Sequence, residues 1–150
     1  MLRLTRLADY AFAVLRHLAS APGAAASARE IADATDLPLP TVSKLLKQLA
    51  QSRMVKAQRG PRGGYQLAQP ADQIKVADVI AAIDGPVSLT ECASHAEDCT
   101  RARHCELRPN FLNINATIRR VLHGISLEDL GRPPGTRHAH APAASDDRRS

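Results

Sequence analysis

Three cysteines lie close together in the second half of the chain, and their chemistry is the most specific that the sequence offers. Cys92, Cys99 and Cys105 are all the cysteines of this 150-residue protein, separated by six and then five residues. Thiolates are preferred ligands of iron–sulfur clusters, zinc and copper(I). An odd number of thiols in one polar stretch fits a soft metal centre better than a disulfide framework. We therefore predict a metal site that still needs one further ligand; three unrelated thiols are the alternative.

The composition describes one domain with an appendage. Only four residues are Phe, Tyr or Trp, so the core must consist of Leu, Ile, Val and Ala. No run of about 18 apolar residues is present, which excludes a transmembrane helix. Asp9 and Arg16 interrupt any signal-peptide core. We therefore expect no membrane partner and a cytoplasmic location, where free or metal-bound thiols are common.

Charge is distributed unevenly along the chain, although the net charge is only +5. Residues 1–70 hold ten Lys and Arg against four Asp and Glu, whereas residues 71–130 hold six against nine. A basic part joined to an acidic, cysteine-bearing part indicates a polyanion-binding module coupled to a sensing module.

Two helices are predicted near the N-terminus. Apolar residues recur at helical spacing over 4–20, and Pro22-Gly23 ends that helix. Ser27 and Glu30 have the spacing of a capping box, which predicts a second, short helix over 28–35.

A third helix follows after a turn, with Pro40 in its first turn and its end near Gln51. Its apolar stripe faces inward, and its opposite face is polar and without acids. This arrangement is typical of the recognition helix of a helix-turn-helix; an ordinary helical hairpin is the alternative. The candidate DNA-contacting residues of this helix are Thr41, Ser43, Lys44, Lys47 and Gln48.

The stretch after the recognition helix reads as a β-hairpin, with strands at 54–58 and 65–67. Its tip is rich in glycine and carries Arg59 and Arg62 but no acid. Directly after a helix-turn-helix, such a hairpin is a wing whose arginines reach a DNA groove or phosphates. A nucleotide-binding loop is a poor alternative because the P-loop Lys-Ser/Thr and its helix are missing. The predicted fold is mainly α with a small β wing.

The predicted organisation has four parts. Residues 1–85 form the winged helix-turn-helix domain, including a helix at 75–84, and residues 86–106 form the cysteine-containing loop. Residues 107–130 form a long dimerisation helix and a capping turn whose leucines close the core. Residues 131–150 show no periodicity and are predicted to be a disordered tail.

The long helix has an apolar face that we expect to pair with its copy in a two-fold homodimer. Packing of this face on its own domain is the alternative. The residues of the face are Phe111, Ile114, Ile118, Val121 and Leu122.

Several segments, taken together and in order, resemble one family. These are L-R-L-T-R-L-A-D-Y-A near the start, R-G-P-R-G-G-Y-Q-L-A at the wing, V-A-D-V-I-A-A-I-D-G, and the late I-S-L-E-D-L. Over residues 1–130 the chain resembles the Rrf-type winged-helix iron–sulfur regulators that include IscR and NsrR. The L-T-E-C-A opening of the cysteine loop is most similar to the SufR-type branch, which regulates the Suf iron–sulfur assembly genes.

The resemblance implies one iron–sulfur cluster per subunit, with 2Fe–2S favoured and 4Fe–4S as the alternative. Cys92, Cys99 and Cys105 match the three thiolate ligands of the family. Arg108 stands where IscR has its histidine ligand and cannot replace it, because guanidinium offers no lone pair. Asp9 matches the acidic ligand that the partner subunit donates in NsrR-like members. Local competitors for this fourth position are His95, His104 and Glu106.

The resemblance also implies how the protein binds DNA. Ser43 and Lys44 match residues that face the major groove, and Arg59 matches a wing arginine that enters the minor groove. A homodimer would bind a palindromic operator, and the cluster-loaded form would repress the Suf genes until the cluster is lost.

Three other functions are alternatives to this one. A nitric-oxide-sensing repressor would use the same ligands, and a zinc or thiol-redox regulator could use the three cysteines with His104. An enzyme is disfavoured because no Cys-His pair or paired carboxylates are expected in a plausible cleft, and no cofactor motif is present.

Overall fold

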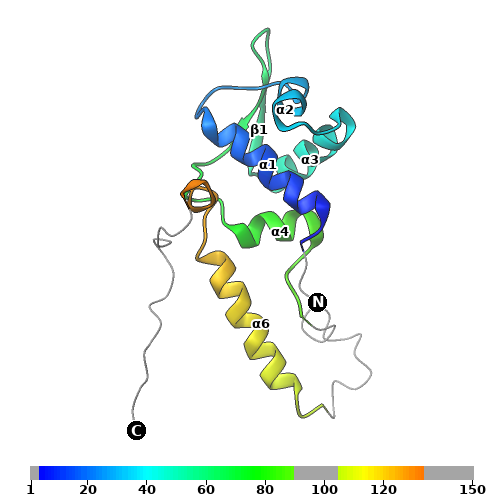
Figure 1. The fold of residues 1–150 in the computed structure, drawn as a ribbon, viewed down its shortest axis with the longest axis vertical. Coiled ribbons are helices and arrows are strands. Elements are labelled where there is room, and N and C mark those ends of the chain that lie inside the picture. The colour runs from blue at the N-terminus through cyan, green and yellow to red at the C-terminus, as the bar shows by residue number, and fades with distance from the viewer. Residues whose placement is uncertain (1–3, 90–104, 134–150) are drawn as a thin grey trace.

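The computed structural model describes residues 4–89 and 105–133 (Figure 1). The tail predicted at 131–150 lies outside the described residues beyond Pro133. The elements are α1 (Arg6–Ser20), α2 (Ala28–Thr35), α3 (Leu39–Gln51), β1 (Val55–Gln58), β2 (Gly64–Leu67), α4 (Val76–Asp84), α6 (Arg108–His123) and the 3-10 turn η1 (Asp129–Gly131). The predicted helices and strands begin and end within about two residues of these bounds.

Side-chain caps explain where the first helices begin. The Thr5 hydroxyl oxygen accepts a hydrogen bond from the Ala8 amide at 3.2 Å and so caps α1. At α2 the predicted capping box is present. The Glu30 amide donates to Ser27 Oγ at 3.2 Å, and the Ser27 amide donates to Glu30 Oε2 at 2.7 Å. These bonds satisfy amides that have no partner within the helix.

The core of the winged domain lies between α1, α2, α3 and α4 and is closed by β1 and the C-terminal turn. Burial of each aliphatic side chain contributes about 1.5–3 kcal/mol to this core. The largest fully buried side chains are Leu15, Ile31, Leu45, Leu46, Leu49, Ile74, Leu127, Val14, Val42 and Val79. Of the two leucines expected to close the core, Leu127 does so, whereas Leu130 is 45% exposed. That second expectation was wrong, because η1 points Leu130 toward solvent.

The wing is an antiparallel pair, with Val55 opposite Leu67 and Gln58 opposite Gly64. It is tied to the domain by Ala26 and Tyr65, whose amides and carbonyls exchange hydrogen bonds of 3.0 and 2.8 Å. Gly64 has φ +154°, and a Cβ at this position would lie 2.5 Å from the Ala26 carbonyl. Only glycine therefore fits where the wing meets the chain before α2.

Helix α4 lies between the winged domain and α6 (Figure 1). Val79 belongs to the main core, whereas Val76 and Ile80 form a second apolar cluster with Ile118 and Leu122 of α6. Only the second half of α6 takes part in this cluster. The first half extends away from the winged domain, as Figure 1 shows.

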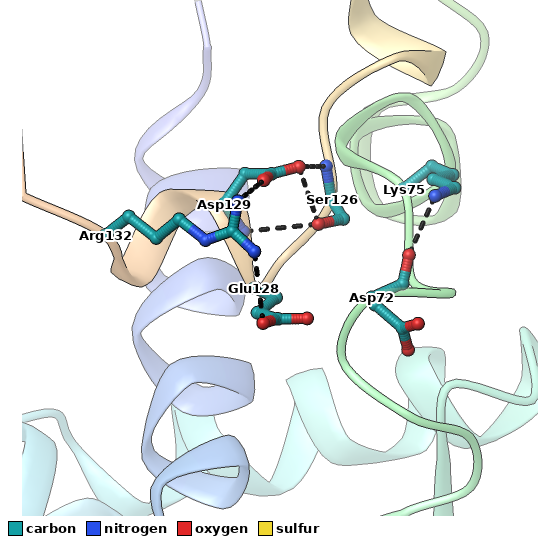
Figure 2. A network of polar contacts seen from close by, with 6 residues as sticks. All are labelled: Asp72, Lys75, Ser126, Glu128, Asp129 and Arg132. Carbon is teal, nitrogen blue, oxygen red and sulfur yellow. Dashed lines mark hydrogen bonds and ion pairs between the residues drawn. The ribbon is translucent and has the colours of Figure 1, made fainter. Parts of the chain in front are cut away.

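The chain after α6 returns to the segment before α4 and is fixed there by backbone and side-chain bonds. The Leu127 amide donates to the Ile74 carbonyl at 2.8 Å, and the Val76 amide donates to the Ile125 carbonyl at 2.9 Å. Figure 2 shows the buried Asp129 carboxylate at the centre of this return. It accepts bonds from the Ser126 amide at 2.9 Å and hydroxyl at 2.7 Å.

The fold class predicted from the sequence is confirmed: the protein is mainly helical with a two-stranded antiparallel wing. Among the described residues, no helix has both the length and the apolar character needed to cross a bilayer.

Candidate functional site

The recognition helix α3 is oriented by its buried stripe, which consists of Val42, Leu45, Leu46 and Leu49. Packing of this stripe leaves the predicted DNA-contacting residues on the other side. Lys44 and Lys47 are exposed, and Thr41, Ser43 and Gln48 are half-buried. The helix has no acidic residue. Its outer face therefore presents two cations and several hydrogen-bonding groups, which suit phosphates and base edges.

Gln48 differs from its neighbours on this face. Its Oε1 atom is buried and has no hydrogen-bond partner in the described part of the chain. An unsatisfied buried acceptor costs about 1–3 kcal/mol. Rotation of the Gln48 side-chain amide, so that Oε1 accepts a hydrogen bond from a donor outside the protein, would remove this cost.

The wing tip presents Arg59 and Arg62, which are both exposed. Neither arginine forms an ion pair with a described residue. The turn beneath them is closed by the Gly63 amide, which donates to the Gly60 carbonyl at 2.9 Å. Gly60 has φ +118°, a conformation that the sequence predicted for glycines at this tip. The two arginines thus lie at the tip of a short two-stranded ribbon.

The cysteine site is only partly within the described residues. Cys105 is a free, half-buried thiol three residues before α6, and its carbonyl accepts from the Arg108 amide at 3.2 Å. Cys92 and Cys99, like the competitors His95 and His104, lie outside the described ranges. The described residues alone contain no group of three or more His, Cys, Asp or Glu able to hold a metal.

Asp9 lies in the first turn of α1, where its amide donates to the Thr5 carbonyl at 3.1 Å. Its carboxylate is exposed and makes no ion pair in the described part of the chain. Helix α1 packs on α4, whereas Cys105 precedes the end of α6 that extends away from the winged domain (Figure 1). The 16 residues of α6 span about 24 Å. Asp9 therefore lies at the winged domain, whereas Cys105 lies at the far end of α6.

The donor chemistry of these residues fits an iron–sulfur cluster. Among the described residues, Cys105 has no disulfide partner and the Asp9 carboxylate makes no ion pair, so both groups are available as ligands. Glu106, the described local competitor, is also exposed and lies next to Cys105.

The proposed dimerisation residues divide into two groups in the structure. Ile118 and Leu122 pack against the α4 cluster of their own chain. Phe111, Ile114 and Val121 are 37%, 48% and 45% exposed. Leu107, which the sequence reasoning did not include, is 60% exposed. The residues Leu107, Phe111, Ile114, Ile118 and Val121 recur at intervals of four and three, which is the heptad spacing of a helix-pairing seam.

The Rrf2 family model, described as an iron-dependent transcriptional regulator, matches residues 4–133. The chain belongs to the Rrf2 family. This Rrf2 protein is 32% identical over 130 residues to an HTH-type transcriptional regulator of Haemophilus influenzae, a match that covers 86% of each chain. A regulator of Synechocystis is 33% identical over 130 residues and covers 86% of this chain and 87% of its own. The expectation that the protein is a transcriptional regulator rather than an enzyme is confirmed.

Solved structures of Rrf2-like proteins have the same fold. CymR, the global cysteine regulator of B. subtilis, is 30% identical with a TM-score of 0.68, covering 87% of this chain and 96% of its own. IscR of T. potens is 25% identical with a TM-score of 0.65, covering 86% and 85%. The winged helix-turn-helix of this Rrf2 protein is therefore established.

Two contacts of this Rrf2 protein were missed by the sequence reasoning. The Thr5 amide and hydroxyl both donate to the Asp84 carboxylate, and the Leu89 amide donates to Asn115 Oδ1 at 3.2 Å. Asn115 is only 5% exposed. In the sequence, Asn115 is a polar residue one turn before Ile118 and Arg119, which is only a weak signal for a buried contact. No sequence pattern signals the contact between Thr5 and Asp84.

Proposed function

We propose that this Rrf2 protein is a homodimeric repressor that reads iron–sulfur cluster status and controls Suf-type cluster-assembly genes. The most direct support for this proposal is that one chain contains both a DNA-binding surface and a cysteine-containing segment. An acid-free recognition helix and an unpaired arginine wing precede a segment that contains all three cysteines. A regulator of this kind needs a DNA-reading surface and a sensor whose state alters that surface.

On DNA, the exposed cations would divide into two roles. Lys47, Lys56 and Arg62 would bind phosphates and supply most of the affinity together with its salt dependence. Ser43 and Lys44 would contact base edges in the major groove, and the neighbouring Thr41 and Gln48 offer further hydrogen-bonding groups. Arg59 would enter the minor groove.

The exposed seam of α6 supports a dimer. Its apolar side chains repeat at heptad spacing, and in a monomer Leu107, Phe111, Ile114 and Val121 would remain in contact with water. A two-fold axis along this seam would place two winged domains on one duplex. The operator would therefore be a palindrome.

For the sensor, we assign Cys92, Cys99 and Cys105 of one subunit and Asp9 of the other as ligands. A bound cluster would supply a link between subunits that iron scarcity or oxidants can remove. The protein's own contribution would be three thiolates from one subunit and one carboxylate from its partner. We favour 2Fe–2S over 4Fe–4S.

The sensor must change DNA affinity by an amount that matters in a cell. Allosteric coupling of about 1–3 kcal/mol corresponds to a change of about 5–150-fold in binding. A small change in the spacing of two recognition helices is sufficient for this, because both must fit successive grooves at once.

A cluster-free thiol regulator is the second candidate. The similarity to CymR, the global cysteine regulator of B. subtilis, is slightly higher in TM-score and identity than the similarity to IscR, so the fold does not favour a cluster over free thiols. In such a regulator the cysteines would respond as thiols or bind zinc with His104. A nitric-oxide sensor would share the cluster and differ in its trigger.

The decisive experiment is to purify the full chain without oxygen and to measure iron, sulfide and zinc together with the visible spectrum. Near-stoichiometric iron and sulfide with charge-transfer bands would support the cluster. Zinc, or a colourless protein that resists reconstitution with ferrous iron and sulfide, would contradict it and favour the second candidate.

The fourth ligand and the coupling need a matched pair of variants. We expect Asp9→Ala to alter the cluster spectrum and shorten the lifetime of the cluster, whereas Asp33→Ala, which removes an exposed acid of α2, should leave both unchanged.

DNA binding is measured with duplexes that the wild type selects from a random library. Equal affinities of loaded and empty protein at the same salt concentration would refute cluster sensing.

A further inference from the structure

We propose that Asp84 is a positioning residue that joins α4 and the segment leading to the cysteines to the first turn of α1. Through this joint, a change around the cysteines reaches the DNA-binding domain. The inference rests on the proposed function, since it explains how the sensor and the recognition helix are coupled.

The contact has two bonds and spans 79 residues of sequence. The Thr5 hydroxyl donates to Asp84 Oδ1 at 2.6 Å, and the Thr5 amide donates to Asp84 Oδ2 at 3.3 Å. The Thr5 hydroxyl oxygen also accepts from the Ala8 amide, so Thr5 already caps α1. A carboxylate from another helix is therefore not needed to begin α1. What it adds is a fixed position of α1 relative to the end of α4.

Helix α4 is the connection between the winged domain and α6. One face contributes Val79 to the core that holds the recognition helix, and another contributes Ile80 to the cluster with Ile118 of α6. Both faces belong to one rigid helix of nine residues. Any shift of α4 therefore changes the positions of α6 and of the winged domain together.

The two ends of α4 are held differently. At its beginning, backbone bonds link Ile74 and Val76 to the chain after α6. At its end, Gly85 with φ +86° terminates the helix, and the Thr5–Asp84 bonds tie its last residue to α1. Thr5 and Asp84 are both exposed, so water competes for these bonds. Of the two attachments, the one at Asp84 is the easier to open.

Residues 85–89 lie between this joint and α6. Five residues beyond Asp84, the Leu89 amide donates to the buried Asn115 Oδ1 of α6 at 3.2 Å. The short segment is thus attached to α1 at one end and to α6 at the other. Displacement of its far end would be transmitted to Asp84 and then to the first turn of α1, which also carries Asp9.

The test compares Asp84→Ala and Thr5→Val with the wild type in the full-length protein. The protein is reconstituted with ferrous iron and sulfide or left empty, and both forms bind the library-selected duplex at one salt concentration. The ratio of the two affinities measures coupling, which a merely stabilising contact would not change. We expect the ratio in both variants to fall from the range of about 5–150 toward 1, with the iron content unchanged.

Three controls test whether a loss of coupling comes from the position of α1 rather than from lower stability or a lost negative charge. Asp72→Ala removes an exposed acid four residues before α4 and should keep the wild-type ratio. Ser27→Ala removes a helix cap that has no bond to α4 and should also keep it. Thr5→Ser retains the hydroxyl and should restore coupling. If Asp84→Ala does not fold, Thr5→Val still provides the test because it leaves Asp84 in place.

The outcomes are distinguishable. A wild-type ratio well above 1 that Asp84→Ala and Thr5→Val both retain would overturn the joint and leave the proposed function intact. A ratio of 1 in the wild type would overturn both. Loss of coupling in each single variant, with no further loss when Asp84→Ala and Thr5→Val are combined, would support the joint.

Discussion

Gly64 determines at the scale of one residue whether the wing can join the domain. Its backbone lies so close to the Ala26 carbonyl that a methyl group has no space. The adjacent Tyr65 uses this approach to exchange two backbone hydrogen bonds with Ala26. The direction of the wing, and with it the position of Arg59 and Arg62, thus depends on residue 64 being a glycine, which has no side chain.

Glu30 provides a pH-dependent contribution at the same scale. The Ser27 amide, and then its hydroxyl, stabilise the carboxylate and hold the pKa of Glu30 below its ordinary value of 4.5. A lowered pKa in the folded state means that this contribution is complete above pH 4.5 and is lost as the pH falls through the lowered value.

We therefore predict that Glu30→Gln lowers the free energy of unfolding at pH 7 and that the difference from the wild type shrinks below pH 4. Urea unfolding at the two pH values measures this. Asp33→Asn, which changes the same charge on the same helix without a capping bond, should show no comparable pH trend. A difference for Glu30→Gln that is equal at both pH values would contradict the prediction.

At the scale of elements, the return of the chain after α6 controls how that helix is held. The Asp129 carboxylate accepts two bonds from Ser126, and its other oxygen lies 3.2 Å from the Arg132 guanidinium. The Asp129 side chain is 3% exposed, whereas Arg132 is 40% exposed. The bonds to Ser126 therefore stabilise the turn more than the partly screened ion pair does.

We predict that Asp129→Ala lowers the free energy of unfolding by about 1–3 kcal/mol, because the Ser126 amide is left buried without its acceptor. Hydrogen exchange at the amides of Leu127 and Glu128, which bind the segment before α4, should accelerate. Glu128→Ala is the control, since Glu128 is an exposed member of the same network (Figure 2). Equal effects of the two substitutions would show that burial of Asp129 is not the cause.

At the scale of the whole molecule, α6 leaves the domain with an apolar seam still exposed. Its second half packs on α4, and its first half presents Leu107, Phe111 and Ile114 to solvent. Such a surface is stabilised when a second copy covers it. The proposed ligand set, in which the partner subunit supplies Asp9, makes the same demand.

We predict that Ile114→Glu converts the dimer to a monomer, because two carboxylates would be buried in the seam without partners. Sedimentation equilibrium at several concentrations measures the dissociation constant, which should rise by at least about tenfold, equivalent to 1.4 kcal/mol. Ala116→Glu places the same charge on the other side of α6 and should leave the dimer intact. A wild-type protein that sediments as a monomer would refute the dimer itself.

The sequence by itself determined the local elements of this protein. The Ser27–Glu30 box, Pro40 in the first turn of α3 and the glycines of the wing each act on residues a few positions away. Such signals can be read along the chain because their physical cause lies within one turn of helix or one hairpin. The fold class followed from them, and so did the acid-free face of α3.

Only the tertiary structure decided how those elements meet. It assigned Ile118 and Leu122 to the chain's own α4 and left Ile114 exposed, although all three belong to one apolar stretch. It also joined Thr5 to Asp84 across 79 residues. These contacts depend on which surfaces face each other after folding, and no short-range pattern records that choice. For that reason the sequence could propose candidate ligands, whereas the Thr5–Asp84 contact between α1 and α4 is visible only in three dimensions.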